Sequence, residues 1–258
     1  MAKTLELHDR VPPGFQAEYV AKQRPIAVRG AAADWPAVQT WNPAFLKERA
    51  GHHEVSQISL SFEELEEFSF GEYLDLLQEP PDDVGVLPYI RNKFLHDDFP
   101  ELSPDVGRLD WLQPTWLEKE PLASMLRVMR PHWFNWCELF ISQPQVRYPL
   151  LHTDACGFHA WSVQVYGIKR YWVWPLLPDF KDTHCIGKDL DTLLGVEPYA
   201  IEIGPGDAIV IPSNLPHVAE SVTTSITIAG SYVDEVNWPE FSREFFEREL
   251  QRELQRAS

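Results

Sequence analysis

Cysteine is scarce in this sequence of 258 residues, and the cysteines lie far apart. There are three, Cys137, Cys156 and Cys185. An odd and widely spaced set lacks both the even number of a disulfide framework and the close pairs of a zinc knuckle. No apolar run approaches the roughly 18 residues of a membrane span. The first residues also lack the apolar core of a signal peptide. We therefore expect a cytoplasmic protein with no membrane-spanning segment.

Positive charge is scarce as well. Lysine and arginine number 22 against 39 aspartates and glutamates, which gives a formal net charge of −17 at pH 7. A nucleic-acid backbone is bound through lysine and arginine, so this balance argues against a nucleic-acid partner. An acidic surface has two other readings: it keeps the chain in solution, or it attracts a basic peptide or protein.

The second half of the chain has the pattern of a β protein. Short apolar segments are separated by turn signals, among them Gly204-Pro205-Gly206-Asp207, which predicts a type II turn. The predicted strands are residues 133–142, 150–154, 160–166, 169–174, 199–203, 208–211, 217–222 and 225–233. Eight short strands in about a hundred residues predict a mainly β fold, a double-stranded β-helix or jelly roll of the cupin kind.

The rest of the chain is expected to elaborate this core within a single domain of residues 1–258. Residues 1–130 predict an α/β extension, with helices that begin at Asn42-Pro43 and after Ser69. Strands are predicted at residues 24–30, 53–59 and 86–92, and the jelly roll takes residues 131–235. Residues 238–257 form an amphipathic helix that either covers the barrel or pairs with a second subunit in a homodimer.

Three His-x-Asp/Glu triplets are present, where the composition alone predicts about 1.4. They are His52-His53-Glu54, His96-Asp97-Asp98 and His152-Thr153-Asp154. The first opens a strand near the N-terminus, where surface positions are expected for His52 and Glu54. The second lies in a loop, where helix capping or solvent exposure is expected. In the third, strand alternation turns His152 and Asp154 to one face, and His217 follows a later strand. Two imidazoles and one carboxylate are the ligand set of a non-haem iron(II) site.

Lys169 gives this interpretation further support. It begins an aromatic, otherwise apolar strand, Lys169-Arg170-Tyr171-Trp172. A lysine rarely enters such a face without an anion, and a dicarboxylate inside the barrel would supply one. The alternative is a lysine at a turn whose ammonium reaches solvent.

The combined motifs resemble one family. His152-Thr153-Asp154, Gly167-Ile168-Lys169, residues 204–212 and Pro216-His217 are similar to those of the Jumonji-C, or cupin-like, 2-oxoglutarate oxygenases. The likeness extends to Asp34-Trp35-Pro36 and covers about residues 20–235. The layout is similar to that of the asparaginyl hydroxylase that inhibits hypoxia-inducible factor.

The resemblance implies specific roles. His152, Asp154 and His217 would bind iron(II), and Lys169 would pair with the distal carboxylate of 2-oxoglutarate. Tyr89 falls where related enzymes place a tyrosine that bonds the same carboxylate, although an ordinary strand aromatic is the alternative. Ser231 stands where the family has an asparagine, and its hydroxyl can still bond the cosubstrate or a ligand.

The substrate side of the site departs from the family pattern. Residues 155–159 add about two positions between the metal motif and Lys169, and Ala160 replaces an expected asparagine. His159 is either an additional substrate contact or a buried, hydrogen-bonded histidine.

The implied reaction uses iron(II), 2-oxoglutarate and dioxygen to hydroxylate a C–H bond, and a protein or peptide side chain is the expected substrate. The alternatives are demethylation of N-methyl-lysine, hydroxylation of a small molecule or of tRNA, and a non-catalytic cupin that only binds a metal.

Overall fold

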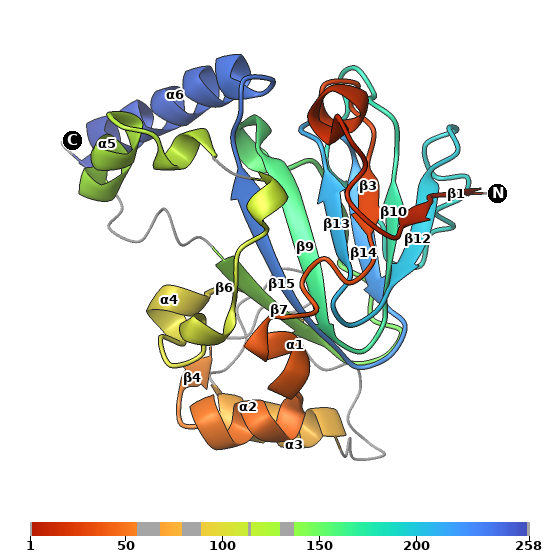
Figure 1. The fold of residues 1–258 in the computed structure, drawn as a ribbon, viewed down its shortest axis with the longest axis vertical. Coiled ribbons are helices and arrows are strands. Elements are labelled where there is room, and N and C mark those ends of the chain that lie inside the picture. Colours follow the sequence, from red (N-terminus) through yellow and green to blue (C-terminus); the bar gives the residue numbers. More distant parts are fainter. Residues whose placement is uncertain (1, 56–67, 79–88, 113–114, 130–136, 257–258) are drawn as a thin grey trace.

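Two β-sheets face each other at the centre of the molecule (Figure 1). The computed structural model describes residues 2–55, 68–78, 89–112, 115–129 and 137–256. The larger sheet has seven strands, in the spatial order β2 (Leu7–His8), β3 (Ile26–Val28), β13 (Ala208–Ile211), β9 (His159–Tyr166), β15 (Ser225–Tyr232), β7 (Cys137–Ser142) and β6 (Ile90–Phe94). The smaller sheet has four, in the order β1 (Lys3–Thr4), β12 (Tyr199–Ile203), β10 (Lys169–Val173) and β14 (His217–Ser221).

A further strand extends the smaller sheet. β8 (Leu150–Leu151) pairs with β11 (Thr183–His184), and single bridges join Arg147 to Glu220 and His152 to His217 of β14. Of the strands from β7 onward, β7, β9, β13 and β15 lie in the larger sheet, and β10, β12 and β14 lie in the smaller one, with β8 beside β14. This is the strand order of a double-stranded β-helix, and the predicted jelly roll is confirmed.

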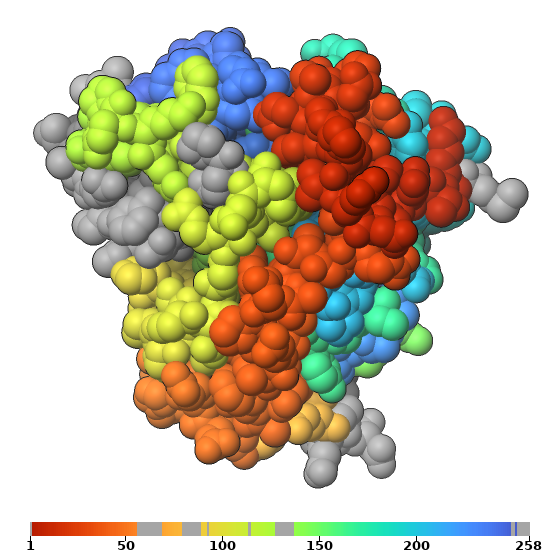
Figure 2. Space-filling view, viewed as in Figure 1, coloured from red at the N-terminus to blue at the C-terminus, as the bar shows by residue number. Residues whose placement is uncertain are grey.

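Apolar side chains cover both faces of the larger sheet. In β13 the residues alternate, with Ile209 and Ile211 between the sheets and Ala208 and Val210 on the outer face. The outer face packs against the N-terminal elements, which Figure 2 shows spread over one face of the molecule in red to yellow. Because both of its faces are buried, β13 is an uninterrupted apolar run rather than an alternating one.

Six α-helices lie around the sheets in the described part of the chain. They are α1 (Pro36–Thr40), α2 (Pro43–Ala50), α3 (Phe70–Gln78), α4 (Leu95–Asp98), α5 (Leu122–Met129) and α6 (Trp238–Arg256), and a small hairpin of β4 (Glu54–Val55) and β5 (Phe68–Ser69) precedes α3. Two predicted helix starts are confirmed. The Asn42 side chain accepts the Phe45 N–H at 3.0 Å, and Ser69 and Glu72 cap each other's backbone N–H groups. None of the helices within the described ranges is long and apolar enough to span a membrane.

α6 confirms the prediction of a C-terminal helix that covers the barrel. Phe241 and Phe245 pack against Cys156 and Phe158 at one end of the jelly roll, beside α5 (Figure 1). The pairing of this helix with a second subunit stays a prediction.

The predicted strands agree with the structure except at a few ends. The predicted turn at residues 204–207 is present, with Gly206 at φ +86° and a 3.0 Å bond from the Asp207 N–H to the Gly204 carbonyl. The strand predicted at 150–154 was wrong at its end, since β8 stops at Leu151 and a helical turn follows Asp154. Residues 56–59, 86–88, 133–136 and 257 of other predicted elements lie outside the described residues.

Candidate metal centre

A cavity of about 370 Å³ lies between the two sheets. Alternate residues of several strands line it, because every second side chain of a strand faces the interior. The lining includes Glu138 and Phe140 of β7, Ala160 and Ser162 of β9, Lys169 and Tyr171 of β10, His217 and Ala219 of β14, and Thr227, Ala229 and Ser231 of β15. Loop residues Tyr89, Tyr148, His152 and Asp154 complete the walls, and Cys156, Phe158, Phe245 and Arg248 line the same cavity from the α6 side.

The structure brings His152, Asp154 and His217 together at this cavity. One potential ligand atom from each lies within 4.8 Å of the others. The two histidines are opposite each other on neighbouring chain segments, because the backbone N–H of each bonds the carbonyl of the other, at 2.8 and 3.2 Å. Asp154 is the N-cap residue that precedes the helical turn Ala155–Gly157, yet its carboxylate makes no capping bond there. The Asp154 carboxylate instead lies 3.7 Å from His217 Nε2.

Backbone bonds fix the orientation of both imidazoles. His152 Nδ1 lies 3.0 Å from the Leu150 carbonyl, and His217 Nδ1 lies 2.9 Å from the Leu215 carbonyl. A carbonyl only accepts, so Nδ1 carries the hydrogen and the Nε2 lone pair remains for a ligand. Burial and the neighbouring His217 lower the pKa of His152 to about 4, which keeps the ring neutral. Two imidazoles with Nε2 directed away from their backbone bonds and a carboxylate fit the donor set of a non-haem iron(II) site with open positions.

The described residues contain a second cluster with metal-ligating groups, formed by His52, His53 and Glu101. His53 Nε2 lies 2.6 Å from the Glu101 carboxylate, and the His52 side chain is 72% exposed. The surface position predicted for His52 and Glu54 is confirmed, whereas His53 is half-buried. Glu101 could not be associated with them from spacing, because it lies in a different part of the sequence.

Lys169 is buried on the wall of the cavity, with 2% of its surface exposed. Its ammonium donates to Tyr89 Oη at 2.7 Å and to Thr227 Oγ1 at 3.0 Å, and Thr227 in turn donates to Gln164. In the described parts of the chain no carboxylate pairs with it, and burial lowers the pKa of Lys169 to about 7. The alternative of a lysine that reaches solvent is therefore wrong. A buried cation whose contacts are only neutral hydroxyls and aromatic rings favours an anionic ligand.

The other two predicted cosubstrate residues also line the cavity. Tyr89 is 3% exposed and lies against Lys169, and burial raises its pKa well above the ordinary value. Ser231 lies on β15, two residues beyond Ala229, on the interior face. Their roles stay predictions. Thr227 was missed, although alternation back from Ser231 along the same strand would have found it.

Glu138 was also missed. It lies on the cavity wall, and burial together with the nearby Asp154 carboxylate raises its pKa to about 7. Arg91 of β6 lowers this pKa, but its guanidinium bonds Tyr148 Oη at 2.5 Å and makes no ion pair with Glu138 within 4.0 Å. No sequence motif marks Glu138, since only the position of β7 brings it to the site.

His159 has the buried, hydrogen-bonded role that was one of its two predicted readings. It is fully buried and faces away from the cavity, because the inward positions of β9 are Ala160 and Ser162. Its Nδ1 accepts the Ser213 N–H at 2.8 Å, so Nε2 carries the hydrogen toward Asp234 Oδ1, 3.3 Å away. Burial raises the pKa of Asp234, but His159 and backbone N–H groups outweigh this effect and hold it below the usual value.

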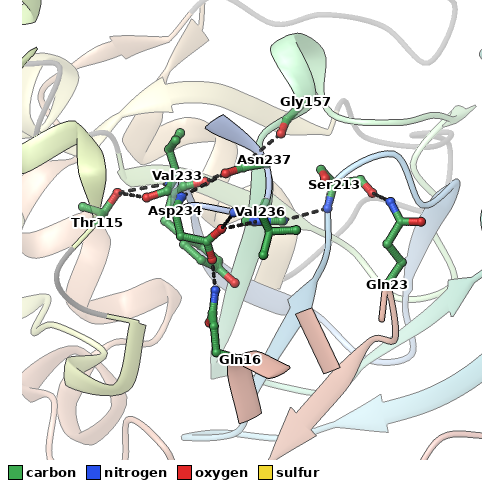
Figure 3. A network of polar contacts seen from close by, with 11 residues as sticks. Gln16, Gln23, Thr115, Gly157, Ser213, Val233, Asp234, Val236 and Asn237 are labelled. Carbon is green, nitrogen blue, oxygen red and sulfur yellow. Dashed lines mark hydrogen bonds and ion pairs between the residues drawn. The ribbon is translucent and has the colours of Figure 1, made fainter. Parts of the chain in front are cut away.

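Asp234 is the centre of a polar network that joins the segments beside the metal ligands (Figure 3). Gln16 donates to its carboxylate, and its backbone N–H donates to the Asn237 side chain at 2.9 Å. Asn237 also donates to the Gly157 carbonyl at 2.9 Å. The network thus links the turn after Asp154 to Ser213, in the loop that leads to His217, and fixes the positions of both chain segments.

Comparison with known proteins identifies the family of this fold and site. The chain is similar to a protein of Arabidopsis thaliana named lysine-specific demethylase JMJ21, with 25% identity over 246 residues. The match covers 87% of this chain but 24% of that protein, so the chain spans about a quarter of the relative's length. A model of the cupin-like domain matches residues 12–189, which include His152, Asp154 and Lys169. With more than half of its length matched, this chain belongs to the Jumonji-C/cupin-like family.

Proposed function

We propose that the chain is an iron(II)- and 2-oxoglutarate-dependent oxygenase that hydroxylates a C–H bond, with a protein or peptide side chain as substrate. Family membership supports an oxygenase-type enzyme in general. The observation that carries the proposal is the buried ammonium of Lys169 in the same cavity as His152, Asp154 and His217. An apolar strand has no structural need for this charge, whereas a bound dicarboxylate would neutralise it.

The register of the smaller sheet supports a dicarboxylate of this length. Lys169 pairs with Ser221, and Val173, four residues later in β10, pairs with His217. Four strand positions correspond to about 13 Å. Lys169 and His217 therefore lie at opposite ends of the cavity, and a five-carbon dicarboxylate can lie between their side chains with one end at each.

The protein's part in this chemistry is to bind, orient and exclude water. Bound iron, with the cosubstrate and dioxygen, supplies oxidative decarboxylation to succinate and oxygen transfer to the substrate carbon. Lys169, beside Tyr89 and Thr227, binds the distal carboxylate. The Leu150 and Leu215 carbonyls hold both imidazoles in the ligating tautomer. Phe158 and Phe245 cover the cavity from the α6 side and limit the entry of water.

A second candidate function is demethylation of N-methyl-lysine. The observation in its favour is the similarity to a protein whose name gives that activity. The chemistry at the metal is the same, since hydroxylation of an N-methyl group is followed by loss of formaldehyde. Formaldehyde release from a methylated peptide separates this outcome from stable hydroxylation, which adds about 16 Da. A non-catalytic cupin would bind the metal and form no succinate.

The test is anaerobic addition of iron(II) and 2-oxoglutarate, followed by oxygen. The intact protein should give a weak visible charge-transfer band and then succinate. His152→Ala should lose both, because one of three protein ligands is gone. Thr153→Ala is the matched control, since Thr153 lies between the ligands and does not line the cavity. Succinate formation by His152→Ala at the rate of the unmodified protein would refute the assignment.

A further inference from the structure

The carboxylate of Glu138 lines the cavity but lies outside the cluster of His152, Asp154 and His217 and makes no contact with the Lys169 ammonium. Glu138 lies on β7 opposite Ala229 of β15, two residues before Phe140. The Phe140 ring lies 5.7 Å from the Lys169 ammonium, at the cosubstrate end. Because both side chains face the cavity, Glu138 lies nearer the metal end, within the electrostatic reach of Asp154.

The Glu138 carboxylate is available for a ligand. Among the residues that the structure describes, it makes no hydrogen bond within 3.5 Å and no ion pair within 4.0 Å. A half-buried carboxylate without a partner is unfavourable, and loss of water together with the Asp154 charge raises its pKa to about 7. A positively charged group bound in the cavity beside Glu138 would offset this unfavourable free energy.

None of the positively charged side chains that the structure describes around the cavity forms an ion pair with the Glu138 carboxylate. Arg91 directs its guanidinium at Tyr148, with its centre 5.3 Å from the Tyr148 ring as well as the bond to the hydroxyl. Lys169 faces the cosubstrate end. Arg248 of α6 lines the cavity but is exposed, so solvent and salt screen its charge more than that of the half-buried Glu138.

We propose that Glu138 is the specificity-determining residue of the site and selects a substrate side chain that carries an ammonium or guanidinium group. The inference rests on the proposed function, and it adds the charge of the substrate. The formal net charge of −17 is consistent with a basic partner.

The test uses four labelled peptides that differ only at the central residue. Arginine is compared with its neutral isostere citrulline, and lysine with norleucine. Binding is measured by fluorescence anisotropy with iron(II) and 2-oxoglutarate under anaerobic conditions, so no turnover is needed. At least one charged peptide should bind about tenfold or more tighter than its neutral counterpart. The arginine and lysine arms separate a guanidinium from an ammonium.

Variants test whether Glu138 causes the preference for charged over neutral peptides. Glu138→Gln should reduce the preference to within about threefold, and Glu138→Asp, which keeps the charge, should restore part of it. Glu202→Gln is the control, since it removes one negative charge from an exposed position on β12. The charge-transfer band of each variant reports an intact metal and cosubstrate site.

Two kinds of failure are distinguishable. Loss of the band and of succinate in the unmodified protein would refute the proposed function. With the band present, equal binding of charged and neutral peptides would refute the role of Glu138, and so would no binding at millimolar concentration. A preference for charged peptides that persists in Glu138→Gln would also refute the role of Glu138.

Discussion

Lys169 is the residue whose environment gives the clearest functional prediction. Burial lowers its pKa to about 7, so the ammonium form in the free protein falls from about 90% at pH 6 to about 10% at pH 8. A dicarboxylate binds the charged form and restores the proton. The apparent affinity for 2-oxoglutarate should therefore fall about tenfold from pH 6 to pH 8. Anaerobic titration of the iron(II) protein measures this dependence.

Lys169→Met is the control for this pH dependence. Methionine keeps an unbranched side chain in the apolar wall but cannot carry the charge. The variant should bind 2-oxoglutarate about 30-fold more weakly, since a charge-assisted hydrogen bond contributes about 2 kcal/mol. The remaining affinity should change little between pH 6 and pH 8. An unchanged slope in Lys169→Met would assign the titration to another group, such as Glu138.

Single residues were predictable where local spacing or a motif marks them. His152 and Asp154 are two positions apart in extended chain, and Lys169 interrupts an apolar strand. Glu138 and Thr227 carry no such mark, because their place depends on which strand lies beside which and in what register. The grouping of Glu101 with His53 depends in the same way on tertiary structure alone.

The turn between β9 and β10 illustrates how one element positions a site residue. Gly167 has φ +74°, and an added Cβ would lie 1.9 Å from the Thr224 carbonyl oxygen. This turn is also hydrogen-bonded to the turn between β14 and β15, because the Ile168 N–H donates to Thr223 Oγ1 at 2.9 Å. This packing of two turns fixes the start of β10 and therefore Lys169.

Gly167→Ala should destabilise the protein by about 3 kcal/mol or more, through left-handed strain and a clash with backbone. Chemical denaturation gives the free energy of unfolding. Gly187→Ala is the matched control, because Gly187 has φ +73° but nothing within 4 Å of an added Cβ. It should cost about 1 kcal/mol, the strain alone. Equal losses in both variants would contradict a role for the packing of the two turns.

Elements were predictable where both apolar pattern and turn chemistry mark their ends. Tyr199–Ile203 and Ala208–Ile211 match their predictions because a glycine-rich type II turn separates two apolar runs. The strands β1, β2 and β11 have two residues each, too few to show any alternation. The early end of β8 reflects the turn after Asp154, which the polar network around Asp234 and Asn237 holds in place.

At the scale of the whole molecule, two clusters among the described residues compete as metal sites, and their positions predict different effects. His152, Asp154 and His217 connect two segments of the jelly roll, whereas His52, His53 and Glu101 lie at the surface beside α2. A ligand that binds only the folded state raises its stability by about 2.7 kcal/mol at a hundredfold excess over Kd. For a chain of this size that corresponds to a rise in Tm of about 5–10 °C.

Manganese(II), which resembles iron(II) in its ligands and is stable in air, should therefore raise Tm by about 5–10 °C, and a chelator should reverse the rise. His217→Ala should abolish the shift, because the ion then has one imidazole and one carboxylate and no longer connects β14 to the segment after β8. His53→Ala should retain it. A shift that disappears in His53→Ala and persists in His217→Ala would move the metal to the surface cluster. The cavity would then bind only an anion at Lys169, and the chain would not be an oxygenase of the proposed type.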